Sequence, residues 1–526
     1  MNKKQKTQKN QAGGGGAAED HAGTSTSDGN GNGGNGNGSA GVAVVEAIVH
    51  LRGQDGVQVG PPLKVPTTIK PNNLKVLVNK LLLTSGAAQG DDNLDGVDLG
   101  DEHTMRPFTF FIDEVELETD LSTHLAKHGN SLESLQVTFK PEAWFKVLPV
   151  SRCSATMTGH SESVLSVNFS PHSRSLASGS GDTTVRIWDL NTQTRMHECK
   201  GHKNWVLCVC WSPDAAVIAS GDVDGLICLW EPEAGTHLGN MKGHKDSITS
   251  LCWEPAHLAL PSRRMCSSSK DKSIKVWDVR TRTCLFSMHS HRQAVTCVRW
   301  SGEGLIYSSS RDCNIYVWET ERGRLIKQLQ GHGHWVNTLA LSTEHALKTG
   351  PYDQKGRRPK EDEKAKQEAM KRFKEACGAG QPERLVSGSD DFTMFLWDPS
   401  KSKHPMTRMT GHKNLVNQVQ FSPNGQWIAS ASFDKSVKLW NGNTGTFVTS
   451  FFGHVGPVYQ IAWSADSRLI CSGSKDSTLK LWDVKSKKLK GDLPGHADEV
   501  FTVDWCTAGT FVASGGRDHV LKLWRH

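Results

Sequence analysis

Short runs of alternating apolar and polar residues fill the chain from about residue 150 to its end. Two such runs often flank a serine–proline turn, as in VLSVNFSPHSRSLASGS over residues 164–180. Alternation with a period of two is typical of strands that bury one face, and regularly spaced short strands indicate an all-β architecture. The larger, C-terminal part of the chain is therefore predicted to consist mainly of β-strands.

A longer repeat is superimposed on this alternation. A Gly-His pair (Ser-His in one repeat) is followed by an aspartate and, six residues after that aspartate, by a tryptophan. The histidines are spaced by 42, 42, 47, 41, 80, 42 and 42 residues. This pattern resembles the WD40 repeat, which implies a β-propeller of four-stranded blades. The eight sets are His160, Asp182, Trp188; His202, Asp224, Trp230; His244, Asp271, Trp277; His291, Asp312, Trp318; His332, Asp391, Trp397; His412, Asp434, Trp440; His454, Asp476, Trp482; and His496, Asp518, Trp524.

The repeated histidines and aspartates have the chemistry of catalytic groups, but the WD40 resemblance implies a structural role. In WD40 proteins the His, the Asp, a Ser or Thr and the Trp form a hydrogen-bonded network that holds each blade. Such a network satisfies polar groups that would be costly to bury without partners. We therefore expect these residues to be scaffold.

The two ends of the repeat region predict how the ring closes. The last repeat ends at LKLWRH and lacks an outer strand, whereas SRCSATMT, residues 151–158, has no inner strands of its own. Pairing these two segments would complete the last blade and leave no exposed sheet edge. We predict eight blades over residues 149–526.

The spacing of 80 residues indicates an insertion in blade five, at about residues 345–383. Its second half, EDEKAKQEAMKRFKEACG from Glu361, has helical composition and an even mixture of charges. One interpretation is a solvated surface helix. The other is a contact with a partner protein or RNA, assisted by the basic run KGRRPK at residues 355–360.

The N-terminal part has a different organisation. Residues 1–40 are a Gly/Asn/Ser-rich tail that is predicted to be disordered. Over residues 41–148, two strand patterns, an amphipathic helix at residues 70–83, and further strand, helix and strand patterns follow one another. This order predicts a small α+β ubiquitin-like (β-grasp) domain in front of the propeller.

Charge distinguishes the two domains. The chain has a net charge of +6, but residues 41–150 sum to −6 and residues 151–526 to +11. A basic body favours contact with nucleic acid or an acidic partner.

Other classes of function lack a sequence signal. No run of 18 apolar residues indicates a membrane span, so no membrane partner is expected. Thirteen cysteines without a CxxC pair favour reduced thiols over a disulfide framework or a zinc site. The chain has no nucleophile elbow, P-loop or HExxH motif. We therefore predict no enzyme activity, no small-molecule substrate and no cofactor or metal of its own.

Several motifs go beyond the general WD40 pattern. They include FKVLPVSRCSATMTGH, GHGHWVNTLALST, SGSDDFTMFLW and LPGHADEVFTVDW. With the acidic β-grasp domain and the position of the insertion, these motifs resemble the Notchless family over about residues 41–526. The resemblance implies an assembly factor of the large (pre-60S) ribosomal subunit, in the nucleolus and nucleoplasm, that contacts pre-60S proteins and rRNA. The runner-up function is a cytosolic adaptor in Notch signalling or in a ubiquitin-ligase complex.

The same resemblance implies a specific partner. In this family the ubiquitin-like domain binds the MIDAS domain of midasin, an AAA ATPase, and an acid of that domain coordinates the Mg²⁺ held by the partner. The family's acid lies in the loop before the last strand, which is Glu133 in this chain. Mg²⁺ prefers hard oxygen ligands, so a carboxylate suits this role. The alternatives are one of the nearby acids, which are Asp113, Glu114, Glu116 and Glu118, or a solvated Glu133 without a ligand role.

Overall fold

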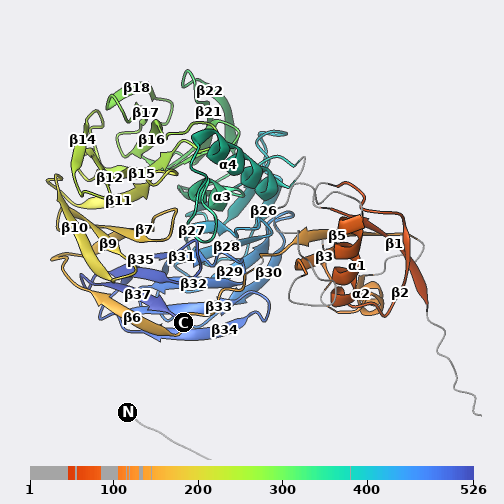
Figure 1. Ribbon diagram of the computed structural model, residues 1–526. Coiled ribbons are helices and arrows are strands. Elements are labelled where there is room, and N and C mark those ends of the chain that lie inside the picture. Colours follow the sequence, from red (N-terminus) through yellow and green to blue (C-terminus); the bar gives the residue numbers. More distant parts are fainter. Residues whose placement is uncertain are drawn as a thin grey trace, which may run out of the picture. The chain divides into compact units, whose positions relative to one another are not determined.

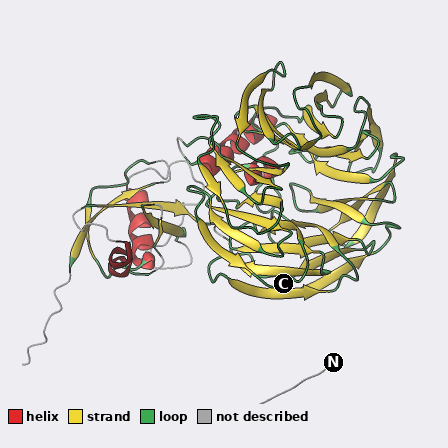
Figure 2. Ribbon diagram, turned by 180° about the vertical axis from the view of Figure 1, so that it is seen from behind, coloured by secondary structure: helices red, strands yellow, loops and turns green. Residues whose placement is uncertain are grey.

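The computed structural model describes residues 45–53, 56–84, 105–113, 115–117, 119–128, 134–143, 145–378 and 381–526. The predicted disordered tail, residues 1–40, lies outside these ranges. Within them the chain forms one five-stranded sheet with two helices and eight four-stranded sheets (Figures 1 and 2). The predicted fold class is confirmed: the chain is mainly β, and a small α+β domain precedes the propeller in the sequence.

The N-terminal sheet has the strand order β2-β1-β5-β3-β4, in which the central strands β1 and β5 run parallel and the other pairs antiparallel. This arrangement is a β-grasp: it consists of two hairpins, a crossover helix, and a final strand inserted at the centre of the sheet. The elements in chain order are β1 (Glu46–Arg52), β2 (Leu63–Pro66), α1 (Pro71–Thr84), β3 (Phe108–Ile112), β4 (Val115–Glu116), α2 (Leu121–His128) and β5 (Leu135–Pro141).

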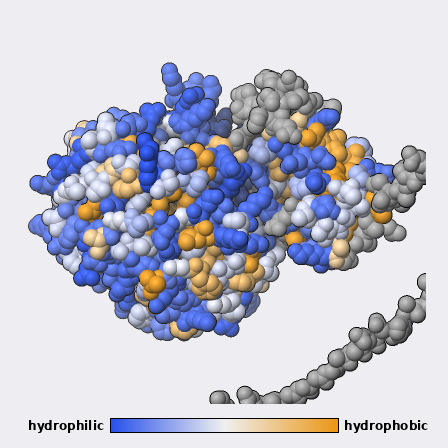
Figure 3. Space-filling model, turned by 90° about the horizontal axis from the view of Figure 1, so that it is seen from below, coloured by the Kyte–Doolittle hydropathy of each residue, from blue (hydrophilic) through white to orange (hydrophobic). Residues whose placement is uncertain are grey.

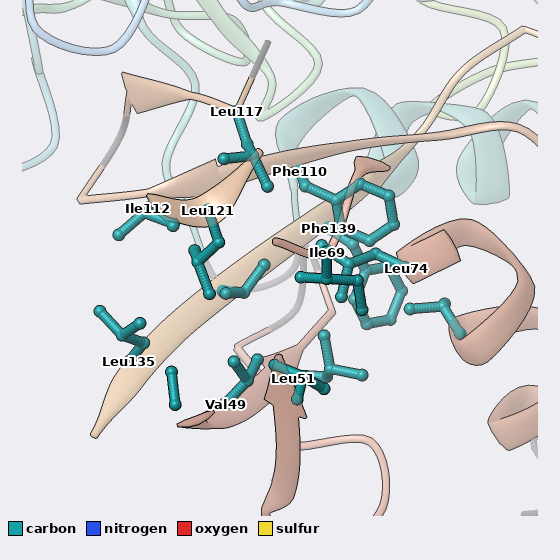
Figure 4. Close-up of a cluster of buried hydrophobic side chains, with 14 of the residues drawn as sticks. Val49, Leu51, Ile69, Leu74, Phe110, Ile112, Leu117, Leu121, Leu135 and Phe139 are labelled. Atoms are coloured by element: carbon teal, nitrogen blue, oxygen red, sulfur yellow. The ribbon is translucent and has the colours of Figure 1, made fainter. Parts of the chain in front are cut away.

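The core of this domain lies between the sheet and the two helices (Figure 4). Alternate residues of β5 point into it, as the period of a strand requires, and Val137 is fully buried. Leu74 and Val78 of α1 are buried four residues apart, so one face of that helix covers the sheet.

The propeller follows, with the first strand of each blade beside the first strands of its neighbours around the ring. Blades one to four are β7 (Val164–Phe169), β8 (Ser175–Ser180), β9 (Thr184–Asp189), β10 (Thr194–Lys200); β11 (Val206–Trp211), β12 (Ile218–Asp222), β13 (Ile227–Trp230), β14 (His237–Met241); β15 (Ile248–Trp253), β16 (Arg264–Ser269), β17 (Ile274–Asp278), β18 (Thr283–Met288); and β19 (Val295–Trp300), β20 (Leu305–Ser310), β21 (Asn314–Glu319), β22 (Leu325–Gln330). Blades five to eight are β23 (Val336–Leu341), β24 (Leu385–Ser389), β25 (Met394–Trp397), β26 (Thr407–Met409); β27 (Val416–Phe421), β28 (Trp427–Ser432), β29 (Val437–Asn441), β30 (Phe447–Phe451); β31 (Val458–Trp463), β32 (Leu469–Ser474), β33 (Thr478–Asp483), β34 (Lys488–Pro494); and β35 (Val500–Trp505), β36 (Val512–Gly516), β37 (Leu521–Arg525), β6 (Arg152–Met157).

Blade eight is assembled from both ends of the propeller, as predicted. Strand β6 pairs antiparallel with β37, with Met157 opposite Leu521 and Arg152 opposite Arg525. The segment before β6 is also held by the ring. The backbone N–H of Val147 donates to Asp466 Oδ2 at 2.8 Å, and Val147 packs in the core shared by blades seven and eight. The packed part of the propeller therefore begins slightly before the predicted boundary at residue 149.

One face of the propeller is predominantly polar (Figure 3). On the face seen in Figure 3, hydrophobic side chains over the blades form small separate groups among polar ones. Among the described residues, no helix has both the length and the apolar character that a membrane crossing requires.

Candidate functional surfaces

The network predicted from the repeat is present in seven blades with the predicted residues, for example His160, Asp182 and Trp188. In those seven, His Nδ1 lies 2.7–2.9 Å from Asp Oδ2. In all eight blades a serine completes the network, with its Oγ 2.7–2.9 Å from His Nε2 and 2.7–3.0 Å from Trp Nε1. These serines are Ser178, Ser220, Ser267, Ser308, Ser387, Ser430, Ser472 and Ser514.

The donors and acceptors of the network fit together in one way. The indole N–H donates to the serine oxygen, the serine hydroxyl donates to His Nε2, and His Nδ1–H donates to the carboxylate, which only accepts. Burial lowers the pKa of His412 and keeps its ring neutral. Burial alone would raise the pKa of Asp182, but hydrogen bonds from His160 and Thr184 outweigh it and hold that pKa below its usual range. Each group already has its partner, which suits scaffolding.

Blade two departs from the prediction, because Asp222 and not Asp224 binds the histidine. Asp222 Oδ2 lies 2.8 Å from His202 Nδ1, and its Oδ1 accepts the backbone N–H groups of Asp224 and Leu226 at 3.0 and 2.8 Å. Asp224 is exposed and accepts a hydrogen bond from Asn204. Residue 222 stands where blade one has Ser180, and a carboxylate at that position reaches the imidazole directly.

This difference gives a matched pair of substitutions. Asp222→Ala would leave the buried His202 Nδ1–H and two backbone N–H groups without their acceptor, so we expect a loss of about 3 kcal/mol in the free energy of unfolding. Asp224→Ala removes an exposed contact and should change it by less than about 0.5 kcal/mol. Urea unfolding of the two variants measures the difference. Equal losses, or a larger loss for Asp224→Ala, would contradict the assignment of Asp222.

The insertion in blade five joins β23 to β24 and contains α3 (Glu344–Thr349) and α4 (Asp362–Cys377), which pack together over the ring (Figure 1). Helix α3 forms ion pairs with the first strands of two different blades. Glu344 Oε1 lies 3.0 Å from Arg299 Nε in blade four, and Lys348 Nζ lies 2.8 Å from Asp504 Oδ2 in blade eight. Blades four and eight face each other in an eight-bladed ring, so α3 spans the central channel at its mouth.

The rest of the insertion continues across the same face. The hydroxyl of Tyr352 donates to the carbonyl oxygen of Asp214 in blade two at 2.9 Å, and its ring meets that of His172 in blade one. All these contacts involve residues in or next to the loop that joins the first strand of a blade to its second strand. The insertion therefore covers the face of the propeller on which these connections lie.

Helix α4 extends over the predicted helical segment, but its interpretation as a solvated surface helix is wrong on one face. Ala365 and Ala369 are buried, and Phe373 stacks on His257 of blade three with ring centroids 4.6 Å apart. These residues recur every four positions and so share one side of the helix. The sequence contains this four-residue spacing of apolar residues, but the many charged residues around it favoured the interpretation as a solvated helix.

The C-terminal end of the insertion holds a buried acid, Glu383, which accepts hydrogen bonds from the hydroxyls of Ser301 and Thr343. Burial raises the pKa of Glu383 from 4.5 to about 7. Between these two pH values the folded chain keeps this proton and the unfolded chain releases it. The contribution of Glu383 to stability is therefore greatest below pH 4.5 and decreases as the pH rises to 7.

We expect Glu383→Gln to remove this pH dependence. The free energy of unfolding of the wild type, relative to that of the variant, should fall by up to about 3 kcal/mol between acid and weakly alkaline pH. Urea unfolding of both proteins across this range measures the difference. A difference that does not change with pH would show that Glu383 is ionised in the folded chain.

The predicted metal ligand, Glu133, lies outside the described residues, as do Glu114 and Glu118. The elements that flank it in the sequence are described: α2 ends at His128 and β5 begins at Leu135. At the start of α2, side-chain hydrogen bonds from Ser122 and Thr123 lower the pKa of Asp120 to about 2. This carboxylate caps the helix that leads to residue 133.

Two of the alternative acids are described. Asp113 is exposed at the turn between β3 and β4, and Glu116 is half-buried on β4. Ile112 pairs with Val137, so Asp113 lies at the end of the sheet where β5 begins. A substitution experiment therefore has to separate Asp113 from Glu133. Among the residues that the structure describes, no cluster of three or more His, Cys, Asp or Glu side chains could hold a metal ion.

Comparisons with known proteins agree with this architecture. A family model for the WD domain, G-beta repeat, matches residues 151–189, 193–231, 235–278, 282–319, 403–441, 445–483 and 487–525, and the NLE (NUC135) domain matches residues 48–125. The repeat without a match is the one that contains the insertion. A computationally designed protein, Ika8, superposes with a TM-score of 0.56 over 72% of this chain and 100% of its own, at 24% identity. That likeness concerns the fold alone.

Curated relatives match across much of the chain. The Notchless protein homolog of Arabidopsis thaliana is 52% identical over 403 residues, which are 76% of this chain and 81% of the relative. Ribosome assembly protein 4 of Saccharomyces cerevisiae is 46% identical over 75% of this chain and 78% of its own. Protein Notchless of Drosophila melanogaster is 46% identical over 71% of this chain and 74% of its own.

Proposed function

The chain belongs to the Notchless family of WD-repeat proteins, and from that premise we propose that it is a non-catalytic assembly factor of the large ribosomal subunit. The observation that carries the proposal is the 46% identity to a relative named ribosome assembly protein 4, over three-quarters of both chains. Such a factor would act in the nucleolus and nucleoplasm, on pre-60S proteins and rRNA.

The finer part of the proposal concerns the β-grasp domain. This domain binds the MIDAS domain of a midasin-type AAA ATPase, and Glu133 supplies a carboxylate oxygen to a Mg²⁺ ion that the partner holds. The metal belongs to the partner, and it would provide the charge that the carboxylate recognises. A carboxylate suits this role because Mg²⁺ prefers hard oxygen ligands.

Force from the ATPase would enter the propeller where the β-grasp domain is joined to it. That entry point is the segment from Val147 to the closing strand β6, which is held by the bond of Val147 to Asp466 in blade seven and by the pairing of β6 with β37 in blade eight. Both attachments belong to the closure of the ring. Pulling there would load two blades together, which suits a protein that transmits force to the particle in which its propeller is lodged.

Co-sedimentation tests the assembly role. A tagged full chain should sediment with large-subunit precursors and should shift to the top of the gradient when rRNA synthesis is stopped. A chain that stays in a soluble pool with ubiquitin-ligase subunits, whatever the state of rRNA synthesis, would overturn the proposal. That outcome would favour the alternative function, an adaptor in Notch signalling or in a ubiquitin-ligase complex.

A further inference from the structure

The face of the propeller opposite the insertion carries an uneven distribution of charge. In each blade, this face is formed by the segment that carries the network histidine and by the turn that carries the network aspartate. In blades three and four these segments carry six basic side chains, which we call the basic surface. Its members are Lys242, Lys245, Lys270, Lys272, Arg292 and Arg311.

The hydrogen bonds of the blades hold the six side chains on one continuous surface. His244 binds Asp271, which lies between Lys270 and Lys272, so the two segments of blade three are adjacent. In blade four the N–H of Arg311 donates to the carbonyl oxygen of Ala294 at 3.0 Å. The hydroxyl of Thr249 in blade three donates to the carbonyl oxygen of Val295 in blade four at 2.8 Å, which joins the two blades.

Within the described parts of the chain, these six cations have no acidic partner. No ion pair joins any of the six to a carboxylate among the described residues. The acids in the same segments are already engaged: Asp271 and Asp312 bind the histidines, and Asp246 accepts from the N–H of Ser247 at 2.6 Å. All of the basic side chains except the half-buried Arg311 are exposed.

On the opposite side of the ring, the basic side chains at the corresponding positions are paired with acids. Blades seven and eight carry Lys475 and Arg517 at the turn positions that correspond to Lys270 and Arg311. There Lys475 Nζ lies 3.4 Å from Glu499, and Arg517 lies 3.8 Å from both Asp498 and Glu499. The same backbone positions are therefore ion-paired on one side of the face, whereas on the other side no described carboxylate pairs with them.

A flat aromatic group borders the basic surface. The guanidinium of Arg311 lies over the ring of Trp335 in blade five, 4.3 Å from its centroid. Unpaired lysines provide point charges for phosphates, and a guanidinium held over an indole presents a planar surface on which a base can stack.

We propose that the basic surface of blades three and four binds the phosphate backbone of RNA. This inference rests on the proposed function, since an assembly factor of the large subunit works among rRNA. Phosphate binding needs several spaced cations and no shaped pocket, which is what this face provides. An acidic peptide would also be attracted to the cations, but it would make no use of the stacked Arg311–Trp335 pair.

Binding of the full chain to a short single-stranded RNA of mixed sequence tests the inference, with affinities measured at several salt concentrations. The double variant Lys270→Gln with Arg311→Gln is compared with Lys475→Gln with Arg517→Gln, which changes the corresponding positions on the opposite side. The first should lower the affinity about tenfold and reduce the slope of log affinity against log salt by about 1.4. The second should change the affinity by less than about twofold.

A quadruple variant extends the series by adding Lys245→Gln and Lys272→Gln, and should lower the salt slope by about 3. The basic residues of the N-terminal tail are the same in every variant, so their contribution cancels. Equal losses for the two double variants would overturn the inference. So would a wild-type chain that binds a poly-glutamate peptide more tightly than the RNA at equal salt.

Failure of this inference can be separated from failure of the proposed function. If the wild-type chain and the quadruple variant both sediment with large-subunit precursors and bind RNA alike, the assembly role stands and the inference that the basic surface binds RNA is wrong. If the wild type does not sediment with precursors, the proposed function itself fails.

Discussion

Replacing Glu133 by alanine is expected to abolish Mg²⁺-dependent binding of the full chain to the MIDAS domain of a midasin-type ATPase. A carboxylate that completes the coordination of a metal ion in an interface is desolvated there, and its removal leaves the ion short of one ligand. We expect a loss of affinity of about 100-fold or more. Titration calorimetry with and without EDTA measures it, since the wild type should bind only when Mg²⁺ is present.

Conservative changes and neighbouring acids provide the controls. Glu133→Asp keeps the charge but shortens the side chain by one methylene, so it should bind more weakly than the wild type and more strongly than Glu133→Ala. Asp113→Ala and Glu116→Ala should bind like the wild type. If Glu133→Ala binds normally and Asp113→Ala does not, the ligand is at the β3–β4 turn, which lies at the same end of the sheet.

Removing the closing strand is expected to have the largest effect on the stability of the propeller. A chain that begins at residue 158 lacks β6 and the buried side chains of Val147, Val150 and Met157. It therefore exposes the edge of β37, part of the core between blades seven and eight, and part of the core between blades eight and one. Each of these side chains contributes roughly 1.5–3 kcal/mol on burial, so we expect the thermal midpoint to fall by roughly 10 °C.

The matched control begins at residue 143, which removes the β-grasp domain but keeps the closing segment. This chain should retain the thermal midpoint of the propeller in the full protein and should not associate on heating. The shorter chain should also associate on heating, because an unpaired strand edge is a template for pairing with a second chain. Equal midpoints and equal light scattering for the two truncations would show that β6 does not close the ring.

Local spacing determined much of the fold from the sequence. The repeat of His160, Asp182 and Trp188 specified the blades, because each network lies within one repeat. In every blade except the fifth, which contains the insertion, the histidine and its aspartate are 20 to 27 positions apart. The order of strand and helix patterns likewise predicted the β-grasp. The missing strand of the last repeat and the surplus strand of residues 151–158 predicted the pairing of β6 with β37.

Tertiary structure decided what depends on the reach of side chains and on contacts between distant residues. Asp222 and Asp224 lie in the same turn of the sequence, and only the position of His202 in space selects the first. The path of the insertion is fixed by bonds such as that between Lys348 and Asp504, which are 156 residues apart.

The net charge of +11 over residues 151–526 indicated a basic propeller but not where the charge is available. Lys270 and Lys475 occupy the same position in the repeat, yet among the described residues only Lys475 pairs with a carboxylate, because Glu499 of the next blade lies beside it. A repeat pattern describes each blade by itself. The neighbours that neutralise a charge or leave it exposed come from other blades, so only the folded ring determines them.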